Sequence, residues 1–274
     1  MTLMSEKKSP ITMPSKKCKL SVNLNKIATL RNSRGGSVPS VTEAAQHMIQ
    51  HGAHGITVHP RPDERHIKKQ DVFELSGLIK EINKQKSNEQ KIEFNIEGYP
   101  SNEFLSLIEE VRPDQATLVP DPPEVLTSNA GWKIKENLPL LKKVQSHLKS
   151  FNVRSSFFID VFTWNESEEE ALLELKPDRV ELYTEKYATD FGTSQQNQTL
   201  QRYKEVAQAL YDQKIGLNAG HDLNLNNIHN LVNEIPQIEE VSIGHALIAE
   251  ALYLGLETTI KKYLKEMGYE NSFS

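Results

Sequence analysis

Residues 215–246 read IGLNAGHDLNLNNIHNLVNEIPQIEEVSIGHA, and this stretch contains the pattern that decides the fold. Two short β-prone runs, residues 215–218 and 241–244, flank an amphipathic stretch over residues 225–233, in which apolar residues recur at helical spacing. A strand, a helix and a second strand in this order predict a parallel pair joined by a right-handed crossover.

The same alternation extends through the rest of the chain. Six further β-prone runs come first, at residues 20–23, 55–59, 92–97, 116–120, 153–160 and 179–183. Helical patterns accompany them at residues 41–51, 71–84, 103–111, 138–149, 167–175, 200–211 and 246–267. Eight such strands allow the sheet to close, so we predict an α/β protein with a (β/α)8 TIM barrel. An open doubly wound sheet is the alternative, although no glycine-rich nucleotide-binding motif supports a nucleotide-binding form of it.

Composition favours one domain. The chain has 274 residues, of which 37% are hydrophobic and 25% charged, and no Gly/Ser-rich or Pro-rich linker divides it. Residues 1–17 carry four lysines with few large apolar groups. We therefore expect residues 1–17 to form a mobile extension and residues 18–274 to form the barrel.

Several classes of partner are disfavoured. A net charge of −5 argues against nucleic acid as a partner. No run approaches the roughly 18 apolar residues of a membrane helix, and residues 1–17 lack the apolar stretch of a secretory signal. The single cysteine, Cys18, can form neither an internal disulfide nor a zinc cluster with other cysteines. We expect a cytoplasmic protein without a membrane partner and without metal ligands.

Polar and titratable residues gather where the predicted strands finish. In a barrel all these ends open onto one face, so residues far apart in sequence converge on one site. A single residue of this kind is more often a surface or structural group, but several independent strand ends together favour an enzyme. The residues concerned are Asn23, Asn25, His59, Arg61, Glu97, Thr127, Glu181, His221 and His245.

Glycines after the seventh and eighth strands indicate a phosphorylated ligand. Gly220 and Gly244 stand where barrels commonly hold phosphate on backbone N–H groups and a helix N-terminus. The alternative is that these glycines only permit tight turns. Donor groups sufficient for a second phosphate are Arg31, Arg34, Arg61, Arg65 and His66.

Six motifs resemble the pyridoxine 5'-phosphate synthase family, in the family's order and close to its spacing. They are residues 21–34 (SVNLNKIATLRNSR), 55–66 (GITVHPRPDERH), 95–97 (NIE), 116–120 (ATLVP), 217–221 (LNAGH) and 242–246 (SIGHA). The resemblance implies a cytoplasmic barrel, usually a homo-octamer, without metal or organic cofactor. It also implies condensation of 1-deoxy-D-xylulose 5-phosphate with 3-amino-2-oxopropyl phosphate to pyridoxine 5'-phosphate, inorganic phosphate and water.

The resemblance also implies a role for each matching residue. His59 and Glu97 correspond to the proton-accepting bases, His221 to the proton donor, and Glu181 to a residue that stabilises a transition state. The residues that would hold the amino-ketone phosphate are Asn23, Arg34, Asp222, Gly244 and His245. Those that would hold the pentulose phosphate are Asn25, Lys26, Arg61, His66 and Thr127.

Three positions depart from the family pattern. Many members have Asp-His at residues 25–26, Gly at 222 and His-Thr-Gly at 183–185, where this chain has Asn-Lys, Asp and Tyr-Thr-Glu. A carboxylate at Asp222 would repel a bound phosphate unless it points away. A non-catalytic binder of phosphorylated metabolites is therefore one alternative. A sugar-phosphate isomerase or aldolase is another, although no strand-end Lys occupies a clear Schiff-base position.

Overall fold

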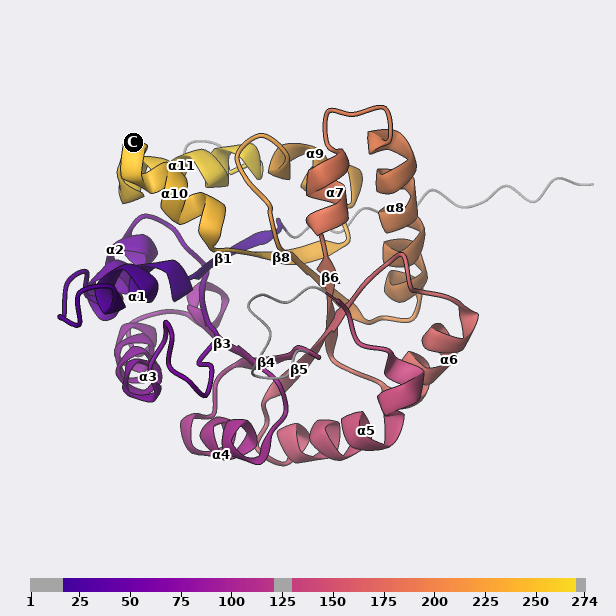
Figure 1. Cartoon of the computed structure of the whole chain (residues 1–274), viewed down its shortest axis with the longest axis horizontal. Helices are drawn as coiled ribbons and strands as arrows, with labels where there is room; N and C mark the ends of the chain where they lie inside the picture. The colour runs from indigo at the N-terminus through magenta and orange to yellow at the C-terminus, as the bar shows by residue number, and fades with distance from the viewer. Residues whose placement is uncertain (1–16, 121–129, 270–274) are drawn as a thin grey trace, which may run out of the picture.

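The computed structural model describes residues 17–120 and 130–269, and its eight parallel strands form a closed barrel in chain order (Figure 1). The strands are β1 (Lys19–Asn23), β2 (Gly55–Val58), β3 (Glu93–Gly98), β4 (Gln115–Leu118), β5 (Arg154–Ile159), β6 (Arg179–Tyr183), β7 (Gly216–Gly220) and β8 (Ile238–Ile243). Pairing of β1 with β8 closes the sheet. The predicted barrel is confirmed and the open-sheet alternative is wrong. The domain limits stay a prediction, because residues 1–16 and 270–274 lie outside the described residues.

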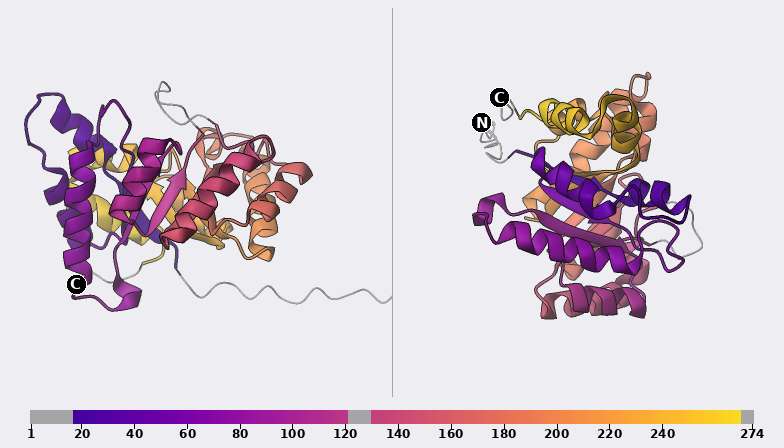
Figure 2. Two further views of the ribbon diagram at one scale, coloured as in Figure 1. Left: turned by 90° about the horizontal axis from the view of Figure 1, so that it is seen from below. Right: turned by 90° about the vertical axis from the view of Figure 1, so that its left-hand side faces the viewer.

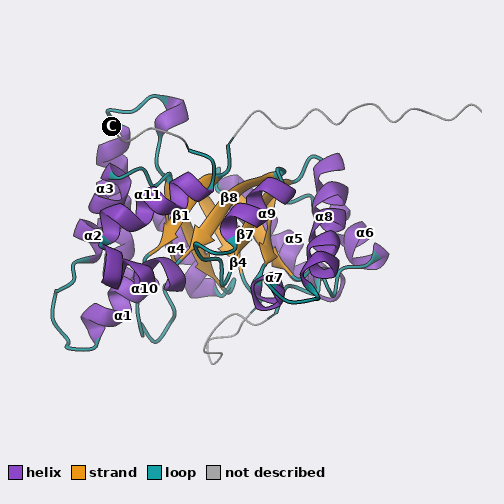
Figure 3. Cartoon of the chain, turned by 90° about the horizontal axis from the view of Figure 1, so that it is seen from above, coloured by secondary structure: helices purple, strands orange, loops and turns teal. Residues whose placement is uncertain are grey.

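Helices surround the barrel and run alongside its strands (Figures 2 and 3). They are α1 (Asn25–Asn32), α2 (Val41–Gln50), α3 (Lys69–Asn83), α4 (Asn102–Val111), α5 (Ile134–Ser150), α6 (Glu166–Leu175), α7 (Glu185–Asp190), α8 (Gln196–Asp212), α9 (Ile228–Glu234), α10 (His245–Leu254) and α11 (Leu256–Glu266), with a 3-10 turn at Asn88–Gln90. The sequence pattern missed α1 and α7, which are too short to show a clear period. The single helix predicted over residues 246–267 is wrong, because Gly255, with φ of 79°, separates α10 from α11.

The hydrophobic core lies between the sheet and the helices. Alternate strand residues such as Leu20, Val22 and Ile56 are fully buried and belong to one core cluster with the apolar faces of the helices. The intervening residues face the barrel interior, since side chains alternate along a strand. That interior is polar: hydrogen bonds connect Ser21 with Thr57, Thr57 with Asn95, and Asn95 with Thr117 across β1 to β4.

The amino-terminal end of the barrel holds paired charges. Lys19 and Arg154 each lie 2.5 Å from a carboxylate oxygen of Glu93. Arg179 donates to Asn218 Oδ1 (2.7 Å) and to Glu239 (2.9 Å). These charge-assisted bonds satisfy the polar groups that the strands carry into this end of the barrel.

Candidate active site

The ends of β1, β2 and β3 bring Asn23, His59 and Glu97 together. Asn23 Nδ2 donates to Glu97 Oε2 (3.2 Å), and His59 Nδ1 lies 3.9 Å from the same oxygen. Asn25 supports the group from the start of α1, since its Oδ1 accepts the backbone N–H of His59 (3.0 Å) and its own N–H donates to Asn23 Oδ1 (3.0 Å). The structure therefore places four of the predicted site residues in contact.

Burial shifts the pKa of both titratable groups of this cluster in the direction that favours the neutral form. It lowers the pKa of His59 well below its usual value, and the positive charge of Arg61 lowers it further. It raises the pKa of Glu97 to about 7, while the bond from Asn23 and the charge of Arg61 oppose the shift. An imidazole that stays neutral and a carboxyl that titrates near neutrality can both accept protons.

Glu181 stands on β6 with its side chain buried inside the barrel. Burial raises the pKa of this carboxyl well above its usual value, and the negative charge of Glu97 adds to the effect. Its buried Oε2 has no hydrogen-bond partner among the described residues. A Cβ added at Gly220 would lie 2.3 Å from Glu181 Oε1, so a larger residue there would require this carboxyl to move. A protonated carboxyl with an unbonded oxygen is suited to donate to a bound ligand.

His221 follows β7 in a backbone conformation that non-glycine residues seldom adopt. Its φ is 82°, and the following Asp222 has a φ of 57°. The imidazole packs against the rings of Phe158 and Tyr183, each at 5.0 Å between centroids. Asp222 is exposed, and its carbonyl oxygen accepts a bond from the side chain of Asn227 (3.2 Å). Backbone strain of the kind that these positive φ values imply is typical of functional sites.

Phe158 was not predicted as a site residue, and Tyr183 was singled out only as a departure from the family pattern. Both lie within strands that it predicted, residues 153–160 and 179–183. Tyr183 comes two residues after Glu181 and therefore shares its side of the sheet. This two-residue spacing from Glu181 along β6 was the signal in the sequence that could have identified Tyr183 as a site residue.

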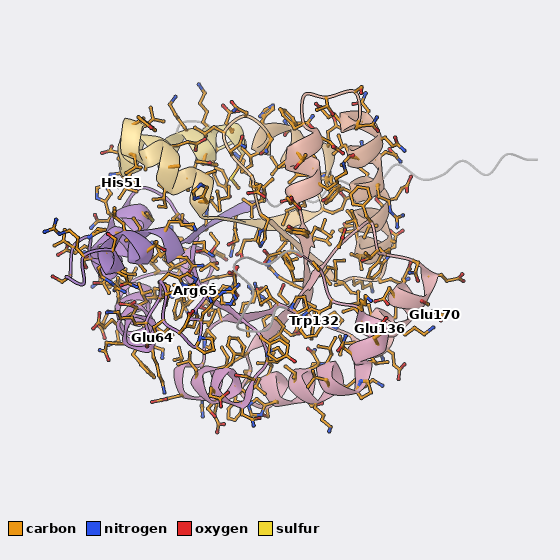
Figure 4. The ribbon with its side chains drawn as sticks, viewed as in Figure 1. His51, Glu64, Arg65, Trp132, Glu136 and Glu170 are labelled. Carbon is orange, nitrogen blue, oxygen red and sulfur yellow. The ribbon has the colours of Figure 1, made fainter. Side chains whose placement is uncertain are left out.

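Cationic groups gather beside the β2–α3 loop. Arg61 is buried, whereas Lys26 on α1 is exposed. Burial, followed by the charges of Arg61, Lys26 and Arg65, lowers the pKa of His66 to about 4. Figure 4 shows Arg65 closer to the middle of the barrel than His51. These side chains form a positive region next to His59, of the kind that binds an anion.

Gly244 and His245 form the start of α10, next to β1. A Cβ at Gly244 would lie 3.1 Å from the Cβ of Asn23, so glycine permits the close approach of the two strand ends. His245 is exposed at the first position of the ten-residue helix. The N–H groups of the first turn of a helix lack partners within the helix and can bind a phosphate.

Two predicted donors, Arg31 and Arg34, are placed differently from the expectation, and a third residue cannot be compared with it. Arg31 is buried and its guanidinium binds the carboxylate of Asp71 and the carbonyl of His66, so it supports the loop. Arg34 is exposed in the turn after α1, and no contact among the described residues connects it with the strand ends. Thr127 lies outside the described residues.

Two kinds of feature are absent from the described residues. Over residues 17–120 and 130–269, no three or more His, Cys, Asp or Glu side chains are grouped so that they could hold a metal ion. Within those same ranges, no helix combines the length and apolar character that crossing a membrane requires.

Known structures share this fold at low sequence identity. Tryptophan synthase from M. tuberculosis, in its aminoacrylate- and BRD0059-bound form, matches with a TM-score of 0.61 at 12% identity, over 92% of this chain and 93% of that one. Thiamine phosphate pyrophosphorylase from Pyrococcus furiosus matches with a TM-score of 0.54 at 12% identity, over 92% and 96%. At such identities the likeness concerns the barrel alone.

Sequence comparison is more specific. Pyridoxine 5'-phosphate synthase from Christiangramia forsetii is 48% identical over 247 residues, 90% of this chain and 98% of that protein. The synthase from Porphyromonas gingivalis is 47% identical over 249 residues, 91% and 98%. The family model described as pyridoxal phosphate biosynthesis protein PdxJ matches residues 20–269. The chain therefore belongs to the PdxJ family of pyridoxal phosphate biosynthesis proteins.

Proposed function

We propose that this chain is a cytoplasmic pyridoxine 5'-phosphate synthase. It joins 1-deoxy-D-xylulose 5-phosphate to 3-amino-2-oxopropyl phosphate and releases pyridoxine 5'-phosphate, inorganic phosphate and water. Beyond family membership, the observation that supports this most is the cluster of His59 and Glu97 at adjoining strand ends, 3.9 Å apart, with His59 buried and Glu97 partly buried. The chemistry requires repeated proton removal from carbon, for which bases active near neutral pH are needed.

The proton-transfer roles follow from the state of each group. His59 and Glu97 accept protons, His59 because it is neutral and Glu97 because its pKa is raised to about 7. His221 delivers protons to departing oxygens from the other side of the barrel mouth. Glu181, whose pKa is raised by burial, stays protonated and donates through Oε2 to the oxygen on which charge develops.

The two phosphates bind at neighbouring parts of the strand-end face, since the ends of β8, β1 and β2 adjoin in the barrel. Backbone N–H groups of Gly244 and His245 hold the amino-ketone phosphate, together with Asn23, Arg34 and Asp222, which the resemblance to the family assigns to the same phosphate. Because Asp222 is exposed, its carboxylate can point into solvent, away from the phosphate. The pentulose phosphate binds the cationic region, through Asn25, Lys26, Arg61, His66 and Thr127. Fixing both phosphates orients the amine toward the ketone and supplies much of the rate enhancement.

The direct experiment is incubation of purified protein with both substrates, followed by chromatographic detection of pyridoxine 5'-phosphate. Product above a buffer control supports the proposal, and its absence from protein that is folded by circular dichroism contradicts it. Calorimetric binding of either substrate without turnover would instead indicate a non-catalytic binder. The variant His59→Asn separates binding from catalysis. It should still bind pyridoxine 5'-phosphate but should not form it from the two substrates.

We propose that the assembly is a homo-octamer, which is what the resemblance to the family implies. Light scattering at working concentration tests this directly. A mass corresponding to eight chains of 31.1 kDa is expected, and a mass of one chain would contradict the octamer.

A further inference from the structure

His221 occupies a part of the site that regular secondary structure does not support. It follows the last residue of β7, and it and Asp222 both have positive φ values. A side chain at such a position, beyond the end of a strand, is less restricted in its rotamers by regular secondary structure than one within the strand. A proton donor must nevertheless be held within a fraction of an ångström of the reacting oxygen. Other contacts must therefore orient the imidazole.

The rings of Phe158 and Tyr183 provide those contacts. Tyr183 meets the imidazole edge to face, with an interplanar angle of 79°, and Phe158 meets it at 52°. Phe158 and Tyr183 also contact each other, at 5.2 Å between centroids. Three rings in mutual contact, with the aromatic pair largely buried, restrict rotation of the third.

The residues on either side of Tyr183 complete the support. The Tyr183 hydroxyl donates to Glu185 Oε2 (3.0 Å), which fixes the far end of its ring. The Thr184 hydroxyl lies 2.6 Å from the carbonyl oxygens of both Gly220 and His221, and its N–H donates to Gly220 (2.9 Å). Residues 183–185 thus hold both the backbone and the ring of His221, and this is a segment where the chain departs from the common family pattern.

We propose that Tyr183, anchored by Glu185, is a positioning residue that orients the imidazole of His221. It is not a catalytic residue, because its hydroxyl is committed to Glu185. Burial and the adjacent Glu185 carboxylate raise the pKa of the Tyr183 hydroxyl, so it stays a hydrogen-bond donor. The proposal rests on the proposed function of His221 as proton donor.

A double-mutant cycle tests it on the whole enzyme. Tyr183→Leu should lower kcat about 10- to 100-fold, the cost of a misplaced catalytic group, with KM for both substrates within about threefold. Tyr183→Phe keeps the ring but loses the bond to Glu185, so its loss should stay within about fivefold. In a His221→Asn background, Tyr183→Leu should cause no further loss of kcat. Equal losses in both backgrounds would overturn the proposal.

A spectroscopic measurement separates this proposal from the donor role. In protein with isotope-labelled histidine, the ring signals of His221, assigned with His221→Asn, should move in Tyr183→Leu as the shielding ring is removed. Tyr187→Phe is the matched control: it also removes a tyrosine hydroxyl bond, to Asn227 (2.7 Å), and should leave the signals in place. Unmoved signals in Tyr183→Leu overturn the positioning role. If the His221 signals move in Tyr183→Leu but His221→Asn keeps full activity, only the donor role of His221 is overturned.

Discussion

Glu93 and Glu97 stand on the same strand, β3, at opposite ends of the barrel, and their carboxyl groups behave in opposite ways. Burial opposes ionisation of Glu93, but Arg154 and Lys19 lower its pKa to about 2. Burial raises the pKa of Glu97 to about 7, because Asn23 and the charge of Arg61 compensate only partly. The two side chains are identical and stand four residues apart on one strand, yet their pKa values differ because their neighbours on other strands differ.

This difference separates stability from function. At the amino-terminal end, Glu93 is paired with Lys19 and Arg154, and this pairing contributes to holding the barrel closed. The carboxyl-terminal end keeps Glu97 and Glu181 poorly compensated, which costs stability and leaves groups that can exchange protons near neutral pH. Variants at the two ends should accordingly affect different measurements.

The largest effect on turnover is expected at His221. His221→Asn removes the titratable proton while keeping a residue that tolerates the positive φ of 82°. The kcat should fall by about 10² to 10⁴, the usual contribution of a general acid or base, with little change in melting temperature. Steady-state kinetics and thermal unfolding check both. Normal turnover with lowered stability would identify His221 as structural, and normal values of both would transfer the donor role to His245.

At Glu97 activity and stability should move in opposite directions. Glu97→Gln should lower kcat by at least about 10²-fold because a base is lost. The folded-state pKa of Glu97 is raised from 4.5 to about 7, so the wild-type free energy of unfolding should fall as the pH rises through that window. Glu97→Gln should therefore be more stable than wild type at pH 8 but not at pH 4. Urea unfolding at both values decides this, and a variant less stable at pH 8 would contradict it.

Glu93→Gln is the matched change at the other end of β3. It leaves Lys19 and Arg154 partly unpaired, so the free energy of unfolding should fall by about 1–3 kcal/mol at pH 7. Because the pKa of Glu93 is depressed from 4.5 to about 2, this difference should disappear as the pH falls from 4.5 toward 2. The kcat of the folded fraction at 25 °C should stay near wild type. A large loss of kcat without loss of stability would break the distinction between the two ends.

The smallest effect concerns the glycine beside Glu181. Gly220→Ala introduces a Cβ that would lie 2.3 Å from Glu181 Oε1, and should lower the free energy of unfolding by about 1 kcal/mol while displacing the carboxyl, because the atom that the Cβ meets is the movable end of a side chain. Gly77→Ala is the control, since its Cβ meets nothing within 4 Å and Ala favours the helix α3 by up to about 1 kcal/mol. Equal stability of the two variants by urea unfolding would contradict this, because it would show that the end of β7 accommodates the extra carbon without a cost in stability.

Much of the fold could be predicted because its signals are local. Alternation of β-prone and amphipathic stretches located all eight strands, with the largest difference at β8, which begins at Ile238 rather than residue 241. Family motifs named His59, Glu97, Glu181 and His221, and the strand-end rule predicted that they would share one face. The helices α1 and α7 escaped prediction because few residues and weak periodicity leave no local signal.

What the sequence determined by itself is the barrel, the family and the identity of the strand-end residues. The tertiary structure decided the state of those residues: the pKa of about 7 at Glu97 against about 2 at Glu93, the unbonded oxygen of Glu181, and the rings that orient His221. A pKa depends on burial and on charges within a few ångströms, and ring packing depends on close contact. The neighbours of these groups come from different strands, so only closure of the barrel brings them together.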